Sequence, residues 1–275
     1  MPFLFPGEFI ASHKLVKPVK SQDGLEIWTA LSETGFYEVV KVFNGMSADA
    51  QRMFAVAETL EKSNTRGLVG FTDFGKTDAG FIFFAARYML GGSLSEKLEK
   101  QKKLNLAKTV RMLRGALCGL ESLHSLNIVH RDLKPANIFI DESGNAAIGD
   151  FGIVKIQNIE DVPGSVFGSA AYMSPEQATD SSNVTFKSDI FSLALIAYEC
   201  LTGRRRYPQK SFKETLIAAL SEKNPPIDEL REFAPDTLAK LIAQMMAPSP
   251  EMRPKSASSI LSEMDSMGLP DEAIF

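Results

Sequence analysis

The sequence has little cysteine, little histidine and no long hydrophobic run, and each shortage argues against a class of protein. Of its 275 residues, 2 are cysteines and 3 are histidines. Cys118 and Cys200 lie far apart, each in a helical pattern, which gives neither a disulfide framework nor a metal-ligand spacing. We expect two buried free thiols in a reducing compartment. No apolar run approaches the roughly 20 residues of a membrane-spanning helix.

Basic charge is also in short supply. The formal net charge is -4 at pH 7, so a general nucleic-acid binder would lack the positive excess that neutralises phosphates. The only tight basic run, GRRRYP at 203–208, is typical of solvated surface. The apolar stretch 3–10 has no basic lead-in, which argues against a signal peptide. We therefore expect a cytoplasmic protein that binds neither membrane nor nucleic acid.

The residues that are present fit an ordinary globular protein, with 44% hydrophobic and 23% charged residues. A chain of 275 residues predicts one large two-part domain or two domains. The early segments 25–31, 36–43 and 80–89 are aromatic and β-branched and are separated by turn residues, so they predict strands. Between them, 47–62 predicts a helix with Ser47 as its N-cap. Its apolar face consists of Met53, Val56, Ala57 and Leu60.

The character of the chain changes after the glycine pair in 89–94. The segment 105–127 predicts a long amphipathic helix, with Asn105 and Asn127 suited to its ends. The apolar stripe of this helix consists of Val110, Leu113, Leu117, Leu120 and Leu123. Further helices are predicted around 188–203, 212–222 and 236–247. A sheet-rich part therefore precedes a helical part, and the joint near 86–91 predicts a cleft, where ligand sites tend to lie.

Charged and amide side chains interrupt the apolar run at 128–140, and burying them is costly unless they are paired or bind a ligand. Asp132 and Asn137 lie on one loop, and Asp150 opens a DFG triplet 13 residues after Asn137. The connector DESGN at 141–145 predicts a hairpin that brings Asn137 and Asp150 side by side. Their oxygens suit Mg²⁺, to which substrate phosphates supply further ligands. Asp132 is then free to accept the proton of a hydroxyl, and Lys134 can offset charge on a transferred phosphoryl group.

HRDLKPAN at 130–137 followed by DFG resembles the catalytic and metal loops of the eukaryotic-type (Hanks-type) protein kinases. The resemblance extends over most of the chain, and its style is similar to that of bacterial members. It also covers the strand lysine Lys41, the segment MSPEQ at 173–177, Asp189, and Arg253 as the partner of Glu176. The joint order of these short matches makes the resemblance specific.

The resemblance implies an α+β, bilobal protein-kinase-like fold over 1–275. A small antiparallel β-rich N-lobe with one main helix (about 1–86) would be followed by a hinge (about 86–91) and a larger, mainly helical C-lobe (about 92–275). ATP would bind in the cleft with Mg²⁺, and protein substrates would present Ser or Thr hydroxyls, including those of the kinase itself. The lysine at 134 resembles the serine/threonine branch.

Roles carry over residue by residue. Lys41 would hold the α- and β-phosphates, Asn137 and Asp150 would bind Mg²⁺, Asp132 would be the base and Lys134 the γ-phosphate partner. The adenine pocket would be formed by Ile27, Val39, Phe139, the Arg87 carbonyl and the Met89 amide, with the small Ala86 opening its back. His130, Phe151, Asp189 and the Glu176–Arg253 pair would be structural.

The chain departs from the family pattern at the glycine-rich loop, here 20–27. The expected glycine positions fall on Lys20, Gln22 and Leu25, and only Gly24 is present, one place off. Backbone N–H groups can still grip phosphates, whereas glycine adds close approach and unusual dihedral angles. We therefore expect nucleotide binding to be weaker, or the geometry of the phosphate site to be altered, rather than binding to be lost. A pseudokinase that serves as a scaffold is the main alternative, and a small-molecule phosphotransferase is a second.

Several assignments stay open. Either Glu58 or Glu61 would pair with Lys41, and we prefer Glu58. Ser165 lies where related kinases carry a phosphorylated hydroxyl, whose phosphate would pair with Arg131, but it equally fits a plain loop serine. Ser169 would shape the peptide-binding loop. Asp132, Asn137 and Asp150 could instead have a purely structural role as capping residues of a loop. Lys41 could likewise be a strand lysine that extends its charged end to solvent. We expect input from a regulatory partner protein.

Overall fold

A computed structural model describes residues 3–22, 24–63, 65–151, 155–156 (backbone only), 169–208, 211–221 and 225–274. The chain forms two compact units. The first comprises Met1–Thr65 and Val69–Met89, and the second comprises Arg66–Leu68 and Leu90–Phe275. Each unit has its own buried hydrophobic core. Among the described residues, no helix is both long and apolar enough to span a membrane.

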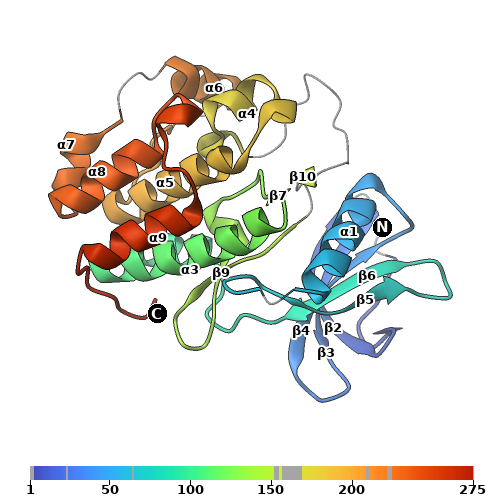
Figure 1. The fold of residues 1–275 in the computed structure, drawn as a ribbon. Coiled ribbons are helices and arrows are strands. Elements are labelled where there is room, and N and C mark those ends of the chain that lie inside the picture. Colours follow the sequence, from blue (N-terminus) through green and yellow to red (C-terminus); the bar gives the residue numbers. More distant parts are fainter. Residues whose placement is uncertain are drawn as a thin grey trace. The chain divides into compact units, whose positions relative to one another are not determined.

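The first unit is an antiparallel sheet with the strand order β1-β2-β3-β4-β6-β5 (Figure 1). Its strands are β1 (Phe9–Ile10), β2 (His13–Gln22), β3 (Leu25–Leu31), β4 (Tyr37–Phe43), β5 (Phe71–Lys76) and β6 (Ile82–Arg87). The predicted strands at 25–31, 36–43 and 80–89 are confirmed as β3, β4 and β6. Alternation sends Val40 and Val42 to a buried cluster with Trp28 and Phe83.

A buried histidine joins the two ends of this sheet. His13 on β2 contacts Glu38 on β4 through Nδ1 (2.6 Å) and Asp73 on β5 through Nε2 (3.1 Å). Strands β2 and β5 lie near opposite ends of the strand order, so these contacts require a strongly curled sheet.

Helix α1 (Ala48–Glu61) covers one face of the sheet. Ser47 caps it by accepting a hydrogen bond from the Ala50 amide (3.1 Å), as predicted. Its buried residues are Ala50, Met53, Val56, Ala57 and Leu60, and they include the predicted apolar face. Phe43 and Phe84 of the sheet pack in the same cluster as Met53. Because residues 41 and 43 point the same way along β4, Lys41 lies on the face that α1 covers.

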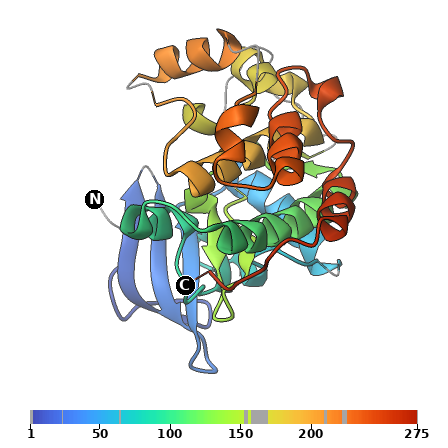
Figure 2. The same ribbon diagram turned by 90° about the vertical axis from the view of Figure 1, so that its left-hand side faces the viewer.

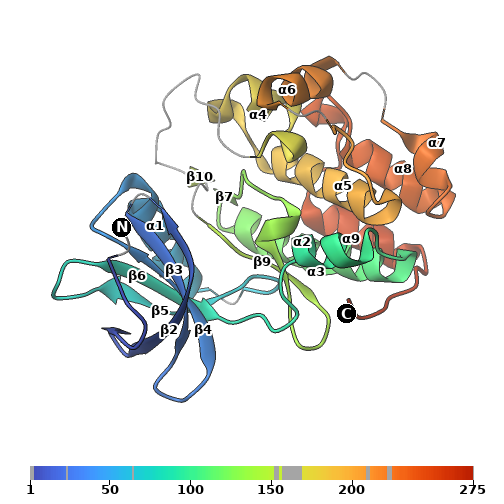
Figure 3. The same ribbon diagram turned by 180° about the vertical axis from the view of Figure 1, so that it is seen from behind.

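The second unit is mainly helical. Its helices are α2 (Leu94–Gln101), α3 (Leu106–Ser125), α4 (Pro175–Thr179), α5 (Phe186–Thr202), α6 (Phe212–Ser221), α7 (Ile227–Arg231), α8 (Asp236–Met245) and α9 (Ala257–Ser266). Short strands and turns connect them: β7 (Ile128–Val129), η1 (Pro135–Asn137), β8 (Ile138–Ile140), β9 (Ala146–Ile148), β10 (Lys155–Ile156), η2 (Ala170–Tyr172), η3 (Ser181–Asn183) and η4 (Pro250–Met252). Helix α5 runs through the middle of this unit, with α3 and α9 on one side and α4 and α6 on the other (Figure 3).

The long predicted helix is confirmed as α3. Asn105 caps it by accepting from the Lys108 amide (2.8 Å), and all five residues of the predicted apolar stripe are buried. The helices predicted around 188–203, 212–222 and 236–247 are confirmed as α5, α6 and α8. Cys200 is buried as expected, but Cys118 is only partly buried, which corrects the expectation for that thiol.

Two glycines of α3 allow other backbone segments to approach closely. A Cβ at Gly115 would lie 2.3 Å from the Ala146 carbonyl oxygen, and one at Gly119 would lie 2.3 Å from the Gly67 carbonyl oxygen. The first contact seats the β8–β9 hairpin against α3. The C-terminal segment reaches the same hairpin, where the Ile274 amide donates to the Gly144 carbonyl (3.1 Å) (Figure 2).

Candidate active site

The carboxylate of Asp132 is the centre of a hydrogen-bond network in the loop that follows β7. Lys134 Nζ lies 2.5 Å from Asp132 Oδ2, and the Ser169 hydroxyl donates to Asp132 Oδ1 (2.9 Å). Lys134 Nζ also donates to Ser169 Oγ (3.1 Å). The Asp132 side chain keeps 14% of its surface exposed, so a substrate group can reach it. A carboxylate held by an ammonium and a hydroxyl is suited to accept a proton at a fixed position.

Asn137 is tied to the same aspartate through its amide nitrogen, which donates to the Asp132 carbonyl (2.8 Å) and to Asp132 Oδ2 (3.3 Å). These bonds leave the amide oxygen on the opposite side of the Asn137 side chain. The hairpin predicted from sequence is confirmed, since β8 pairs with β9 and the Gly149 amide donates to the Asn137 carbonyl (2.9 Å). Asp150 follows directly after this bond.

The donor set fits a hard cation. Asn137 offers an amide oxygen and Asp150 a carboxylate, which are ligands that Mg²⁺ accepts. Among the described residues, no group of three or more His, Cys, Asp or Glu side chains could form a complete metal cage. Such a site suits an ion that keeps waters and takes phosphate oxygens as its remaining ligands.

Two residues beside this site adopt left-handed backbone conformations that non-glycine residues rarely take. The φ angles are 67° at Arg131 and 66° at Asp150. The buried Arg131 is held in place because its carbonyl accepts from Gln177 Nε2 (2.5 Å) and its amide donates to Asp189. Strain of this kind persists where the surrounding structure fixes it, and it is concentrated at functional sites.

Asp189 on α5 anchors the loop from beneath. Its Oδ2 accepts from the His130 amide (2.9 Å) and contacts His124 Nε2 (2.9 Å), while its Oδ1 accepts from the Arg131 amide (2.9 Å). Burial raises the pKa of Asp189. The hydrogen bond and Coulombic interaction with His124, together with those from His130 and its backbone amide, outweigh burial, so the pKa lies below its ordinary value. Asp189 is therefore an ionised acceptor for the loop.

His130 and Phe151 are buried packing residues, as expected. His130 Nε2 lies 3.1 Å from the Gly149 carbonyl oxygen, and the two rings meet edge to face at 6.0 Å. His124, which contacts Asp189 and stacks on Phe186 at 4.5 Å, was not identified from the sequence. No local pattern marks it, because its partners come from a distant helix.

The Glu176–Arg253 pair predicted from sequence is confirmed. Arg253 Nη1 and Nη2 donate to the two carboxylate oxygens of Glu176 at 2.7 and 2.9 Å, and the Ser188 hydroxyl adds a third bond at 2.6 Å. Burial raises the pKa of Glu176, yet Arg253 lowers it more, so the pKa lies below its ordinary value. This pair fixes the start of α4, just after the segment that carries Ser169.

In the sheet unit, four of the side chains predicted to lie at the nucleotide share one face. Ile27 pairs with Lys41 across β3 and β4, and Val39 pairs with Ala86 across β4 and β6. All four side chains are half-buried. Arg87 ends β6, and Met89 lies two residues further along the chain. Phe139 lies on β8 of the helical unit.

Two further features of the sheet unit are the candidate glutamate partners of Lys41 and the glycine-poor segment 20–27. Glu58 and Glu61 are both exposed on α1, whose buried side carries Met53 and Val56, so the pairing of Lys41 with Glu58 stays a prediction. Residues 20–22 end β2 and residues 25–27 begin β3, and Gly24 just before β3 has a φ of 81°. Gly152 of the DFG triplet and Ser165 lie outside the described residues.

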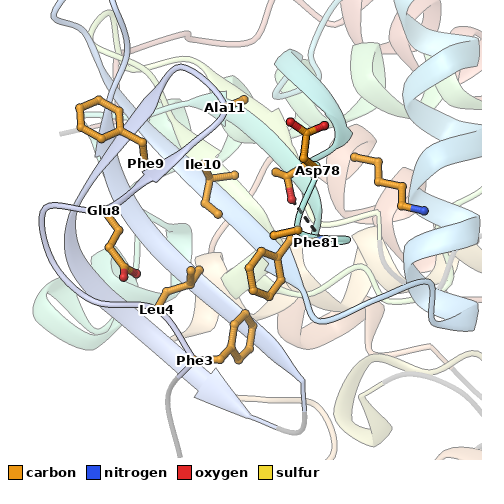
Figure 4. A pocket seen from close by; sticks show the side chains of 11 residues that line it. Phe3, Leu4, Glu8, Phe9, Ile10, Ala11, Asp78 and Phe81 are labelled. Carbon is orange, nitrogen blue, oxygen red and sulfur yellow. Dashed lines mark hydrogen bonds between the residues drawn. The ribbon is translucent and has the colours of Figure 1, made fainter.

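An open hollow of about 670 Å³ in the sheet unit lies between the N-terminal segment and the β5–β6 turn (Figure 4). Phe3 and Phe81 stack across it at 5.4 Å, and Glu8 and Asp78 add acidic groups. None of the predicted catalytic or nucleotide-binding residues is among the described residues that line it. The candidate site is therefore elsewhere.

Comparison with known families gives the same assignment as the geometry. A model described as the protein kinase domain matches residues 30–264. The chain belongs to the protein kinase family. Its sheet unit and helical unit are those of the protein kinase fold, and HRDLKPAN and DFG lie within the matched range.

Curated relatives are bacterial protein kinases. The chain is 30% identical to the serine/threonine-protein kinase pkn3 of Myxococcus xanthus over 223 residues, which are 77% of this chain and 41% of that protein. It is 30% identical to PknL of Mycobacterium tuberculosis (strain ATCC 25618 / H37Rv) over 213 residues, 77% of this chain and 53% of that protein. It is 32% identical to PknD of the same strain over 212 residues, 76% of this chain and 32% of that protein. The chain thus spans about half or less of the length of these relatives.

Proposed function

We propose that this chain is an ATP- and Mg²⁺-dependent protein serine/threonine kinase. The observation that carries the proposal is the joining of Lys134, Ser169 and Asn137 to the carboxylate of Asp132 within a chain of the protein kinase family. Relatives named serine/threonine-protein kinases support the choice of acceptor. The use of ATP fits a cytoplasmic location.

The proposed reaction moves one phosphoryl group. A Ser or Thr hydroxyl of the substrate donates its proton to Asp132, and its oxygen forms a bond to the γ-phosphorus. The bond from that phosphorus to the bridging oxygen breaks, which leaves ADP and a phosphorylated protein. Lys134, 2.5 Å from Asp132 Oδ2, offsets the negative charge of the transferred group.

Further residues position the nucleotide in this proposal. Lys41 contacts the α- and β-phosphates, and Ile27, Val39, Phe139, the Arg87 carbonyl and the Met89 amide surround the adenine. Glu58 orients Lys41. Asn137 and Asp150 hold Mg²⁺, which when bound neutralises phosphate charge. These assignments rest on the family pattern and on the shared sheet face and hairpin described above.

Phosphoryl transfer from labelled ATP tests the proposal. The purified chain is incubated with ATP labelled at the γ-phosphate, with Mg²⁺, and with itself or generic protein substrates. We expect label on serine or threonine, and a loss of about 100-fold or more in Asp132→Asn. Asp78→Asn makes the same chemical change in an exposed turn and serves as the matched control. Absence of Mg²⁺-dependent transfer by the unaltered chain would reject the proposal in favour of a scaffold.

A further inference from the structure

The basic run at 203–208 forms one side of a hollow in the helical unit. Helix α5 ends at Thr202, and Gly203 stops it with a φ of 74°. The three arginines that follow line an open hollow of about 520 Å³. Of the described residues that line it, three carry positive charge (Arg204, Arg205 and Arg206) and one carries negative charge (Glu229).

The carboxylates at this hollow are shared between several donors. Glu229 lies 2.6 Å from Arg204 Nη2 and 3.7 Å from Arg206 Nη1, and it also accepts from the Tyr198 hydroxyl (2.8 Å). Arg205 Nε lies 3.6 Å from Glu199. Three guanidinium groups thus face two carboxylates, so positive charge is in excess. The side chains of Arg204 and Arg205 are 66% and 59% exposed, which leaves their guanidinium groups open to a ligand.

A short turn connects the hollow to the candidate catalytic residue. Ala171 of η2 lines the hollow, and Ser169, two residues earlier, donates to Asp132. Two residues of chain span at most about 7 Å, so the hollow begins close to the point where an acceptor hydroxyl would bind. Tyr172 follows Ala171, and its hydroxyl donates to Glu199 (2.6 Å). Glu199 is also the carboxylate that Arg205 approaches.

An isolated surface arginine paired with a carboxylate is usually plain solvated surface and contributes little. This cluster differs because it lines a hollow, because its positive charges outnumber its negative ones, and because η2 joins it to Asp132. Planar guanidinium groups bind carboxylate and phosphate oxygens through paired hydrogen bonds. The ligand chemistry that fits is therefore an anionic side chain on a bound polypeptide.

We propose that the Arg204–Arg206 hollow is a specificity subsite for an acidic or phosphorylated side chain of the protein substrate, within about five residues of the acceptor hydroxyl. The subsite rests on the proposed kinase function and deepens it. Arg204 and Arg205 supply the charge, and Arg206, over the Tyr198 ring at 5.7 Å, supports them from the wall of the hollow.

Serine peptides that differ at one position test the subsite. Each position within five residues of the acceptor is occupied in turn by Gln, Lys, Asp or phosphoserine, and kcat/KM is measured with the full chain. We expect one position at which Asp or phosphoserine exceeds Gln by about tenfold, as a charge-assisted hydrogen bond predicts, with a smaller ratio at high salt. The Asp and phosphoserine arms show whether a carboxylate or a phosphate is the preferred source of charge.

Variants assign that preference to the hollow. In Arg204→Gln/Arg205→Gln the ratio of acidic to Gln peptide should fall close to one. In Arg205→Glu it should invert in favour of Lys, a gain that a misfolded protein could not show. Arg231→Gln, an exposed arginine on α7 paired with Asp228 and Asp236, should leave the ratio unchanged. Equal rates for acidic and Gln peptides, or a ratio that survives both variants, would overturn the subsite alone, whereas absence of transfer to every peptide would overturn the kinase proposal.

Discussion

Asp189 Oδ2 accepts a hydrogen bond of 2.9 Å from the backbone amide of His130, which joins the buried start of α5 to the loop that carries Asp132. The other oxygen of Asp189 accepts from the next amide, that of Arg131. One carboxylate therefore holds two consecutive backbone amides. The second amide belongs to Arg131, which has a left-handed φ of 67°. Because a non-glycine residue disfavours a positive φ, the loop conformation depends on the hydrogen bonds to Asp189.

Replacing Asp189 with asparagine should loosen the loop. The variant keeps one acceptor oxygen but turns an NH₂ group toward a backbone donor, which should cost about 3 kcal/mol of unfolding free energy. We expect kcat for phosphoryl transfer to fall about tenfold or more, with a smaller change in KM for ATP, because Asp132 is displaced while nucleotide contacts persist. Urea unfolding and steady-state kinetics measure both quantities. Asp78→Asn is the control, and wild-type stability in Asp189→Asn would contradict this role.

The Glu176–Arg253 pair should make the free energy of unfolding decrease at acidic pH. Glu176 has a pKa below its ordinary value of 4.5, so its stabilisation is complete above that pH and is lost as the pH falls through the folded pKa. Glu176→Gln should lower the unfolding free energy by about 3–5 kcal/mol at pH 7, because it leaves Arg253 buried without its charge partner. The difference in unfolding free energy between the unaltered chain and Glu176→Gln should decrease as the pH falls from 5 toward 3. Glu263→Gln, at an exposed position of α9, should show no gap at either pH.

The sequence predicted the elements whose apolar residues repeat regularly. Strands β3 and β4 alternate, and α3 carries a continuous stripe, so local pattern was sufficient. Strand β2 was missed because most of its residues are exposed and it contains Pro18, which hides any alternation. Helix α2 was also missed, although Ser93 and Glu96 form a capping box that the pattern S-x-x-E could have revealed.

In the candidate site, too, features set by local sequence were predicted and features set by long-range contacts were not. The hairpin that brings Gly149 to Asn137 follows from a local turn signal and was predicted. The bond from Ser169 to Asp132 spans 37 residues, and the contact of His124 with Asp189 spans 65, so no local pattern contains them. Which glutamate of α1 pairs with Lys41 on β4 likewise depends on how two separate elements pack, so the sequence left two glutamates open.

Gly115 should be intolerant of a side chain. A Cβ there would meet the Ala146 carbonyl oxygen at 2.3 Å, a backbone atom that cannot move alone. Although alanine favours an α-helix over glycine by about 1 kcal/mol, we expect Gly115→Ala to destabilise the chain by a net of about 1–3 kcal/mol, because the hairpin must shift. Gly70→Ala, where no atom lies within 4 Å of the added Cβ, is the matched control. Thermal unfolding compares the two, and equal melting temperatures would contradict the close contact.

Asn137→Ala should raise the Mg²⁺ concentration that gives half-maximal phosphoryl transfer. The variant removes a proposed metal ligand, the amide oxygen, together with the bonds from Asn137 Nδ2 to Asp132. Loss of the bonds alone would lower kcat without moving the Mg²⁺ dependence, so the shift separates the two roles. We expect an increase of about tenfold or more, as one lost ligand interaction of about 1.4 kcal/mol implies. Ser169→Ala is the matched control, since it removes a hydrogen bond to Asp132 but no metal ligand. It should lower kcat with an unchanged Mg²⁺ midpoint, and an unchanged midpoint in Asn137→Ala as well would remove Asn137 from the metal site.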